Sequence, residues 1–284
     1  MDKFHLIVNS DKDKTFATSQ KIMAYLAAHG KSCGCNAIDA FSDRNYRYTD
    51  PKFIPEDVEC VIVLGGDGTL IQAARDMADR RIPLTGINLG TLGYLTETDR
   101  EGIIPMLDCL IKNEFEIEER MMISGKIHRN GIIVKEDMAL NDIVISRNGV
   151  AGVLRFKISV NGEFLNLYTA DGIIYATPTG STAYNLSAGG PIVTPSASMI
   201  LMTPICPHTL NSRSIILSGE DKIEVEICAK TANEGQLVAF DGDVALKLQI
   251  GDIVEISQST RKTVMIKLSK ISFFQNLRRK MADL

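Results

Sequence analysis

Apolar positions follow two different patterns along the chain, and the first pattern extends over about the first 112 residues. Short apolar runs there alternate with segments of helical spacing, in which apolar residues recur every three or four positions. The pattern predicts strands at 4–8, 33–39, 60–64 and 83–88, and helices at 15–29, 69–79 and 102–112. A stretch rich in Pro, Asp and Tyr reads as a loop up to about residue 58. Because strands alternate with helices, this part of the chain is expected to form a parallel sheet.

From about residue 115 the apolar period changes to two. Residues 115–118, 222–227 and 254–256 alternate between apolar and polar side chains, and Asn130-Gly131 and Asn161-Gly162 are hairpin-turn signals. The pattern predicts an antiparallel β-sandwich. The last segment, 273–284, again has helical spacing and is expected to pack on the first domain.

The predicted fold class is therefore α/β plus all-β. A Rossmann-like α/β domain is expected to comprise residues 1–116 together with 268–284, and a β-rich domain residues 117–267. Hydrophobic residues make up 45% of the chain and charged residues 23%, enough apolar material for two cores.

Charge and cysteine content exclude several function classes. The net charge is −4, and the basic run Arg278-Arg279-Lys280 stands alone, so no nucleic-acid partner is expected. No run of 18 apolar residues predicts a membrane span, and a strand-like run directly after Lys3 argues against a secretory leader. Six scattered cysteines include a Cys33-Gly34-Cys35 pair, but no second pair stands at zinc-site spacing. We expect reduced thiols, a cytoplasmic protein and no metal site made by the protein alone.

One segment is unusual because it carries no charge. Residues 172–212 contain no Asp, Glu, Lys or Arg, yet hold five of the nine prolines. Two interpretations stay open: a buried connection between domains, or a pocket wall of small side chains where a ligand supplies the charge.

Leu64-Gly65-Gly66-Asp67-Gly68-Thr69-Leu70 stands where a buried strand meets a helix. Glycines there can adopt positive φ and let a phosphate approach the backbone, and the helix start offers unpaired N–H groups. The loop is neither a P-loop nor GxGxxG. Asp67 could cap a helix that begins near Thr69, or it could accept a proton or hold a metal ion beside phosphate.

A second motif, Asp171 to Pro191 (DGIIYATPTGSTAYNLSAGGP), identifies a family together with the glycine loop. The two resemble NAD kinases, and 88–95, 139–142 and 207–210 fit the family pattern in the same order. The strong similarity covers residues 60–215.

The resemblance implies a role for each matching residue. Asp67 corresponds to the general base, and the phosphate-handling loop consists of Gly65, Gly66, Gly68 and Thr69. Asn141 and Asp142 correspond to contacts with the adenosine half of NAD, although Asn-Asp before a strand is also ordinary turn chemistry. The remaining expected contacts with the dinucleotide are Tyr94, Thr169, Asp171, Thr182, Ala183, Tyr184, Ser187 and Asp243.

Some of these positions have a simpler explanation or depart from the family pattern. Tyr94 could serve packing alone, and residues 182–187 could be a helix start capped by Ser or Thr. Some relatives carry Gln in place of Asp243, and several carry a basic residue in place of Thr169. The segment Asn9 to Asp13 lacks the proline and basic pattern of many members.

The function implied by the resemblance is phosphoryl transfer to an alcohol. The γ-phosphoryl group of ATP would pass to the 2′-hydroxyl of the adenosine ribose of NAD and give NADP, with Mg²⁺ accompanying ATP. Family members are usually homodimers or homotetramers in which a neighbouring subunit completes the site. The alternatives are a GGDGT-type lipid or sugar-phosphate kinase and a non-catalytic nucleotide-binding sensor. The sequence does not decide whether inorganic polyphosphate also serves as donor, whether NADH is accepted as well as NAD, or whether NADP inhibits the enzyme.

Overall fold

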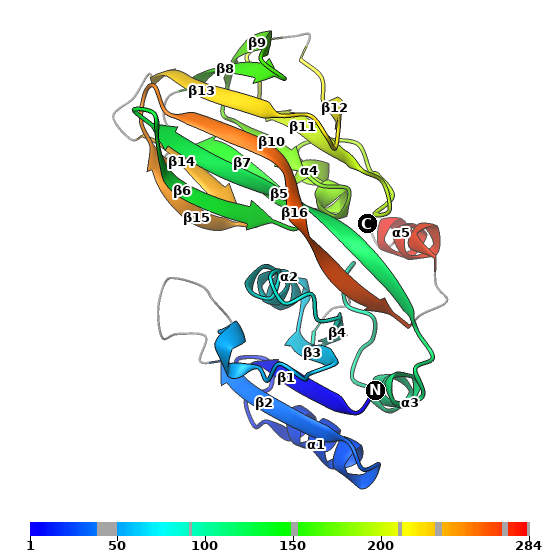
Figure 1. Cartoon of the computed structure of the whole chain (residues 1–284). Helices are drawn as coiled ribbons and strands as arrows, with labels where there is room; N and C mark the ends of the chain where they lie inside the picture. The colour runs from blue at the N-terminus through cyan, green and yellow to red at the C-terminus, as the bar shows by residue number, and fades with distance from the viewer. Residues whose placement is uncertain are drawn as a thin grey trace. The chain divides into compact units, whose positions relative to one another are not determined.

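The chain folds into two compact units, shown in Figure 1. The computed structural model describes residues 1–38, 50–90, 93–148, 153–209, 212–230, 235–268 and 272–282. The first unit is formed by Met1–Glu119 and Thr263–Leu284, and the second by Arg120–Lys262. The chain therefore leaves the first unit once and returns to it once.

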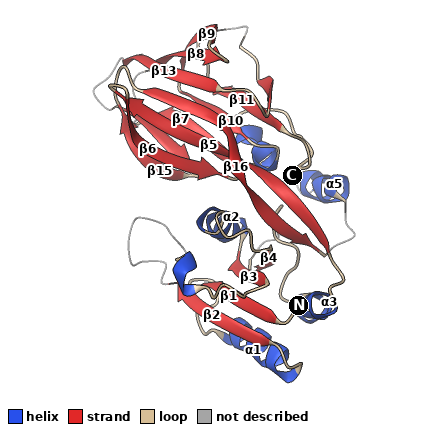
Figure 2. Ribbon diagram, viewed as in Figure 1, coloured by secondary structure: helices blue, strands red, loops and turns tan. Residues whose placement is uncertain are grey.

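The first unit is built on a parallel sheet, as the sequence predicts (Figure 2). Its strands lie in the order β2-β1-β3-β4, and the end of β16 adds a parallel pairing of Met265 with Leu84. The bounds are β1 Lys3–Asn9, β2 Ser32–Ile38, β3 Cys60–Gly65, β4 Leu84–Asn88 and β16 Ile253–Lys267. Every residue of β3 is buried, which explains its continuous apolar run.

Helices α1 Ala17–Ala28, α2 Asp67–Asp76 and α3 Ile103–Lys112 form close to where the helical spacing predicts them, with a 3₁₀ turn η1 at Pro51–Phe53. The C-terminal α5, Phe273–Ala282, belongs to the first unit as expected, but none of its side chains is buried. The apolar face of α3 carries Ile103, Met106, Leu107 and Leu110 into one core with Leu6, Ile62, Leu64 and Ile266. Residues 39–49 of the expected loop lie outside the described residues.

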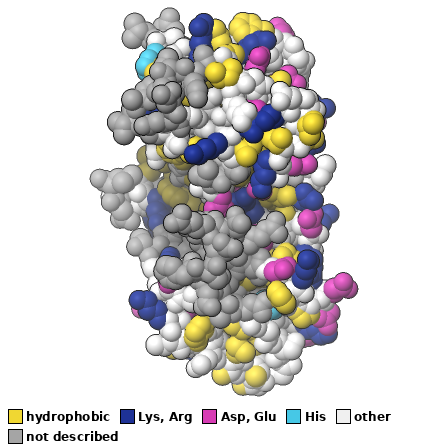
Figure 3. All heavy atoms as spheres, turned by 90° about the vertical axis from the view of Figure 1, so that its left-hand side faces the viewer, with side chains coloured by type: hydrophobic (Ala, Val, Ile, Leu, Met, Phe, Trp, Pro, Cys, Tyr) yellow, Lys and Arg dark blue, Asp and Glu magenta, His cyan; other side chains and the backbone are white. Residues whose placement is uncertain are grey.

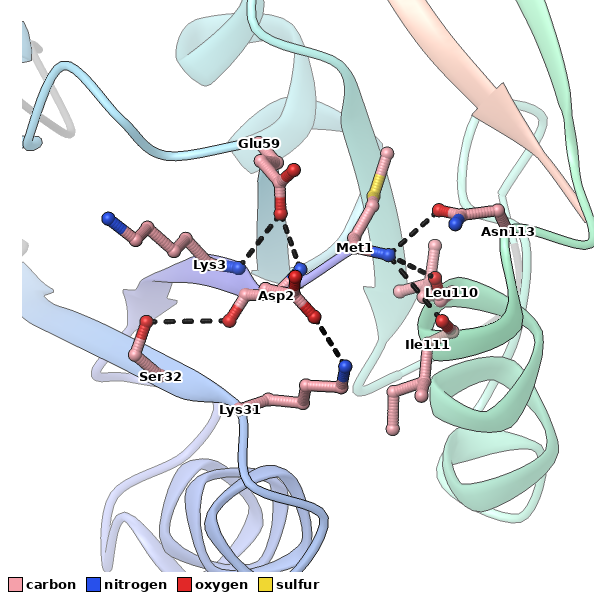
Figure 4. Close-up of polar contacts among 9 residues, drawn as sticks. All are labelled: Met1, Asp2, Lys3, Lys31, Ser32, Glu59, Leu110, Ile111 and Asn113. Atoms are coloured by element: carbon pink, nitrogen blue, oxygen red, sulfur yellow. Dashed lines mark hydrogen bonds and ion pairs between the residues drawn. The ribbon is translucent and has the colours of Figure 1, made fainter.

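The amino group of the chain contacts the end of α3 (Figure 4). Met1 N donates to Asn113 Oδ1 at 2.8 Å and to the carbonyl of Leu110 at 3.4 Å. A positive group is favourable beside the unpaired carbonyls of a helix C-terminus. Glu59 accepts hydrogen bonds from the backbone N–H groups of Asp2 and Lys3, so the start of β1 is fixed from both sides.

The second unit is the predicted antiparallel sandwich. One sheet contains β5, β6, β8, β9, β13 and β16, and the other runs β12-β11-β10-β7-β14-β15. The bounds are β5 Glu116–Arg129, β6 Ile132–Ala139, β7 Asp142–Arg147, β8 Leu154–Val160, β9 Glu163–Ala170, β10 Gly172–Ala176, β11 Met199–Ile205, β12 Ile215–Ser218, β13 Ile223–Lys230, β14 Gln236–Phe240 and β15 Asp243–Leu248. Asn130-Gly131 and Asn161-Gly162 have positive φ and close the β5–β6 and β8–β9 hairpins, as expected.

Side chains from the inner faces of both sheets form one core. Phe156 and Ile158 of β8 belong to the same buried cluster as Tyr175 of β10 and Phe240 of β14. The uncharged segment 172–212 lies wholly within this unit, where it forms β10, η2 (Thr179–Thr182), α4 (Tyr184–Ser187) and β11. Its interpretation as a connection between domains is therefore wrong, although β10 is buried along its whole length.

The surface and the helices bear on possible partners. On the face drawn in Figure 3, acidic and basic side chains of the described residues are interspersed. Among the described helices, none combines the length and apolar character needed to cross a bilayer.

Candidate functional site

The glycine loop ends β3 and begins α2. Gly66 is the N-cap of α2, with φ −143° and ψ −173°, and neither Gly65 nor Gly68 has a positive φ. These glycines therefore do not use the positive φ that glycine permits. Gly65 is required by internal contact, because a Cβ there would lie 2.4 Å from Thr69 Oγ1. Nothing described lies within 4 Å of a Cβ placed on Gly68, so the helix start remains open to an anion.

Asp67 does not cap the helix. It is the first residue of α2, whose N-cap makes no side-chain hydrogen bond. Its carboxylate instead accepts hydrogen bonds from the backbone N–H groups of Tyr94 at 2.6 Å, Leu95 at 3.2 Å and Thr96 at 3.2 Å. The carboxylate thus fixes the segment after β4 beside the glycine loop.

The two carboxylate oxygens of Asp67 differ in how much acceptor capacity they have left. Oδ1 accepts from the N–H groups of Leu95 and Thr96 and from Thr96 Oγ1 at 3.3 Å. Oδ2 accepts from Tyr94 N alone among these contacts, so it retains a lone pair. Buried Asn88 donates to Thr96 Oγ1 at 3.2 Å and thereby orients that hydroxyl toward Asp67.

Tyr94 is half-buried and belongs to the same cluster. Its backbone binds Asp67, and Lys280 Nζ of α5 lies 5.8 Å from the centre of its ring. Burial raises the pKa of Tyr94. Stacking on a base stays a prediction. The neighbouring Thr91 and Leu92 lie outside the described residues.

In the second unit the predicted pair Asn141 and Asp142 is held by Asp241. The Asp241 carboxylate accepts hydrogen bonds from the backbone N–H groups of Leu140 at 2.8 Å, Asn141 at 2.7 Å and Asp142 at 3.0 Å. Asp142 is 5% exposed, and burial, with the charge of Asp241 beside it, raises the pKa of Asp142 to about 7. The turn is thus made by a distant carboxylate, which leaves the Asn141 and Asp142 side chains for other contacts.

The string Thr177 to Pro191 after β10 packs on this turn. Thr177 N donates to the Asn141 carbonyl at 2.8 Å, and a Cβ on Gly180 would lie 2.1 Å from the same oxygen. Ser181 and buried Asn185 hydrogen-bond within the segment, Asn185 Nδ2 donating to the Ser181 and Pro191 carbonyls. Much of the polar character of the string therefore maintains its own shape.

The residues expected to line the dinucleotide site lie on the outer part of this segment. Thr182 and Ala183 are half-buried, Ser187 is exposed, and Tyr184 is 46% exposed. Neither η2 nor α4 begins with a side-chain cap, so the interpretation as a Ser- or Thr-capped helix start is wrong. Asp243 begins β15 and pairs with Phe240 next to the turn that contains Asp241.

Thr169 and Asp171 lie at the other end of β10. Asp142 pairs with Ala176 while Ser146 pairs with Gly172. The four residue steps along β10 span ~13 Å. Arg147 binds Asp171 with two hydrogen bonds, Nε to Oδ1 at 3.0 Å and Nη2 to Oδ2 at 3.1 Å. Within one copy of the chain, Asp171 is therefore far from Asn141 and Asp142.

The described residues form neither a disulfide nor a cluster of metal ligands. All six cysteines are free, and burial, with the neighbouring Cys35, raises the pKa of the Cys33 thiol to about 12. Among the described residues, no group of three or more His, Cys, Asp or Glu side chains is placed to hold a metal ion.

Comparison with known proteins settles the family. Residues 4–115 match the ATP-NAD kinase N-terminal domain and residues 140–268 the ATP-NAD kinase C-terminal domain. The chain belongs to the NAD kinase family. It is 44% identical to the NAD kinase of Lachnospira eligens, over 99% of this chain and 100% of that protein. It is 45% identical to the NAD kinase of Agathobacter rectalis, over 100% of this chain and 99% of that protein.

Solved structures of NAD and NADH kinases share the fold of this chain. Yeast NADH kinase complexed with NADH has a TM-score of 0.85 at 24% identity, covering 99% of this chain and 88% of that chain. An NAD kinase from Archaeoglobus fulgidus in complex with ATP has a TM-score of 0.77 at 24% identity, with 99% of both chains covered. At this identity the likeness establishes the two-unit fold.

Sequence reasoning did not single out two of the residues that organise these clusters. Asp241 had a local signal, since Asp-Gly is a turn dipeptide and Asp241 has φ 50°. Its carboxylate acts about a hundred positions away, on the N–H groups of 140–142, which no local pattern indicates. The ion pair of Arg147 with Asp171 likewise joins separate strands.

Proposed function

We propose that this NAD kinase transfers the γ-phosphoryl group of ATP to the 2′-hydroxyl of the adenosine ribose of NAD, with Asp67 as the general base. Family membership makes the chain an ATP-dependent phosphotransferase with an alcohol acceptor, and it does not favour a lipid kinase, a sugar-phosphate kinase or a non-catalytic sensor. The role of Asp67 rests on the geometry of its carboxylate.

The observation that supports a general base is the unequal use of the two Asp67 oxygens. Oδ1 is held by three donors, which fixes the orientation of the carboxylate, whereas Oδ2 has a lone pair left for a hydroxyl proton. As the ribose oxygen bonds to phosphorus, its proton passes to Asp67 and ADP leaves with the electrons of the broken P–O bond. A base oriented in this way contributes roughly 10²–10⁴-fold to the rate.

The phosphate donor is assigned to the start of α2 and the acceptor to the second unit. Open backbone at Gly68 and the positive end of the helix suit phosphate oxygens. The Asn141 and Asp142 side chains suit ribose hydroxyls, because a carboxylate can accept two hydrogen bonds. Mg²⁺ enters with ATP and offsets phosphate charge.

A direct assay tests the activity. Purified protein is incubated with ATP, Mg²⁺ and NAD, and NADP is detected with an NADP-specific dehydrogenase. Diacylglycerol and fructose 6-phosphate serve as competing acceptors in parallel reactions. Formation of NADP alone is expected, whereas NAD binding without NADP formation would make the chain a sensor.

The functional enzyme is proposed to be a cytoplasmic homo-oligomer in which Asp171 serves the site of a neighbouring copy. Asp171 precedes Gly172 at one end of β10 and Asp142 pairs with Ala176 at the other end, ~13 Å from Gly172, which supports this division of labour. Six free thiols are in keeping with a reducing compartment.

Mixing two inactive variants tests the sharing of sites. Asp142→Asn and Asp171→Asn proteins are unfolded, mixed and refolded together, and their NADP formation is compared with that of each alone. If the two residues act across copies, mixed dimers contain one intact site each, and about a quarter of all sites recover. Activity no higher than that of the separate variants would place both residues in the same copy.

A further inference from the structure

The segment Asn9 to Asp13, which departs from the family pattern, is rigidly built. Lys12 N and Asp13 N both donate to the Asn9 carbonyl at 3.0 Å. Asp13 is buried, and its carboxylate accepts from Ser19 N at 2.9 Å and Thr18 N at 3.2 Å at the start of α1. Burial works against the charged form, but these hydrogen bonds outweigh it and lower the pKa of Asp13. The backbone on both sides of Lys12 is therefore fixed.

One contact ties this segment to the first turn of α2, and Arg100 ties it to the start of α1. Asn9 Nδ2 donates to Thr69 Oγ1 at 3.1 Å. Arg100 Nη2 donates to the Lys12 carbonyl at 3.3 Å and its Nη1 to Thr18 Oγ1 at 3.1 Å. The position of Lys12 relative to the glycine loop is thus set by side chains of the same unit.

The ammonium group of Lys12 lies over the glycine loop. A Cβ on Gly66 would be 2.7 Å from Lys12 Nζ, and no other atom described outside the immediate neighbourhood lies within 4 Å of that point. A Cβ on Gly90, in the segment after β4, would be 4.0 Å from the same nitrogen. Within the described part of the chain Lys12 forms no ion pair, so its charge is available beside the open helix start.

We propose that Lys12 binds the terminal phosphates of the phosphoryl donor in the glycine loop. The inference rests on the proposed function and adds a residue to its donor site. An ammonium group offers three donors and a compact charge, which suits oxygens of a polyphosphate chain whether it belongs to ATP or to inorganic polyphosphate. The charge that builds up on the transferred group is stabilised by a cation held in place before the reaction.

Kinetics of three variants test this assignment. Lys12→Met removes the charge and keeps the length, Lys12→Arg keeps the charge, and Lys14→Met is the matched control, an exposed lysine two positions along the same segment. We expect Lys12→Met to raise KM for ATP at least tenfold and to lower kcat, with KM for NAD within twofold and an unchanged melting temperature. Lys12→Arg should recover part of the loss, and Lys14→Met should match the unaltered protein.

A binding measurement without turnover separates this inference from the proposed reaction. Titration calorimetry with inorganic tripolyphosphate should show at least tenfold weaker binding to Lys12→Met than to the unaltered protein and to Lys14→Met. If no NADP forms but this difference is seen, the proposed reaction fails and the lysine site stands. Equal tripolyphosphate binding by the two methionine variants, or a loss confined to KM for NAD, would overturn the assignment.

Discussion

At the scale of single residues, Asp67 has two tasks that one substitution can separate only in part. Asn is a good helix N-terminal residue, but its amide oxygen cannot replace both carboxylate oxygens that accept from Tyr94, Leu95 and Thr96. We expect Asp67→Asn to lose turnover by a hundredfold or more while the melting temperature falls by only a few degrees. NADP formation and thermal unfolding are the measurements.

The control for Asp67→Asn is Asp99→Asn. Asp99 accepts two backbone N–H bonds where Asp67 accepts three, from Glu101 at 3.0 Å and Gly102 at 3.2 Å, and it is exposed. Its substitution should cost a similar amount of stability and leave turnover unchanged. An Asp67→Asn protein with full turnover would refute the general base, and equal activity losses in both variants would reduce Asp67 to a structural role.

Asp142 makes stability depend on pH in a predictable direction. Its pKa in the folded protein is about 7, against a usual value of 3.8, so the folded state holds the proton more tightly than the unfolded state. The free energy of unfolding therefore falls as pH rises between about 4 and 7. Asp142→Asn removes this dependence. The free energy of unfolding is measured with urea at about pH 5 and pH 8. Between these two pH values it should fall more in the unaltered protein than in Asp142→Asn, by up to about 3 kcal/mol. An identical fall in the two proteins would contradict the buried pair of Asp142 with Asp241.

How far single residues could be predicted depended on the range of their partners. Asp67, Asn141 and Asp142 were found because they stand in contiguous strings of a known family. The hydrogen bonds that Asp67 accepts from 94–96 and those that Asp241 accepts from 140–142 cross 27 to 101 positions, and they exist only once the chain has folded. The sequence therefore predicted which residues matter more readily than what each one holds.

At the scale of elements, two glycines near Asp67 are expected to tolerate a methyl group very differently. A Cβ on Gly93 would lie 2.0 Å from Asp67 Oδ1 and 2.2 Å from Oδ2, so Gly93→Ala must displace the carboxylate. Gly68→Ala meets nothing in the described structure and helps α2, but it occupies the space proposed for phosphate. We expect Gly93→Ala to lower kcat with little change in KM for ATP, and Gly68→Ala to raise KM for ATP with unchanged stability. Initial rates over a range of ATP concentrations and melting curves check both; the same kinetic change in the two variants would contradict this separation.

The elements themselves were well predicted where local physics decides them. Periods of two and 3.6 gave the strands and helices, and both Asn-Gly turns formed because Asn and Gly tolerate positive φ. The start of α2 was expected near Thr69 but lies at Asp67, because the extended Gly66 caps the helix with its backbone. The 177–191 string was less predictable, since its hydroxyl and amide groups bind one another in η2 and α4 instead of capping a helix.

At the scale of the whole molecule, the period change near residue 115 predicted two domains, and the family strings predicted their functions. The return of the chain to the first unit was indicated only by helical spacing in 273–284. The structure adds a stronger tie: the end of β16 brings buried Ile266 into the first core and pairs Met265 with Leu84. This tie was not predicted, because the alternation noted at 254–256 gave no sign that the strand runs on to Lys267.

Two truncations measure what each part of the returning segment contributes. α5 buries no side chain, so a chain that ends at Leu268 should keep its melting transition; the contact of Lys280 with Tyr94 that it loses is worth about 0.5–1 kcal/mol. A chain that ends at Lys262 also loses Ile266 from the core and the pairing with β4, so residues 1–119 should become sensitive to trypsin while 120–262 resist. Limited proteolysis with mass spectrometry distinguishes the fragments. Protection of residues 1–119 in the shorter chain would mean that the strand end is dispensable and that the first core is complete without it.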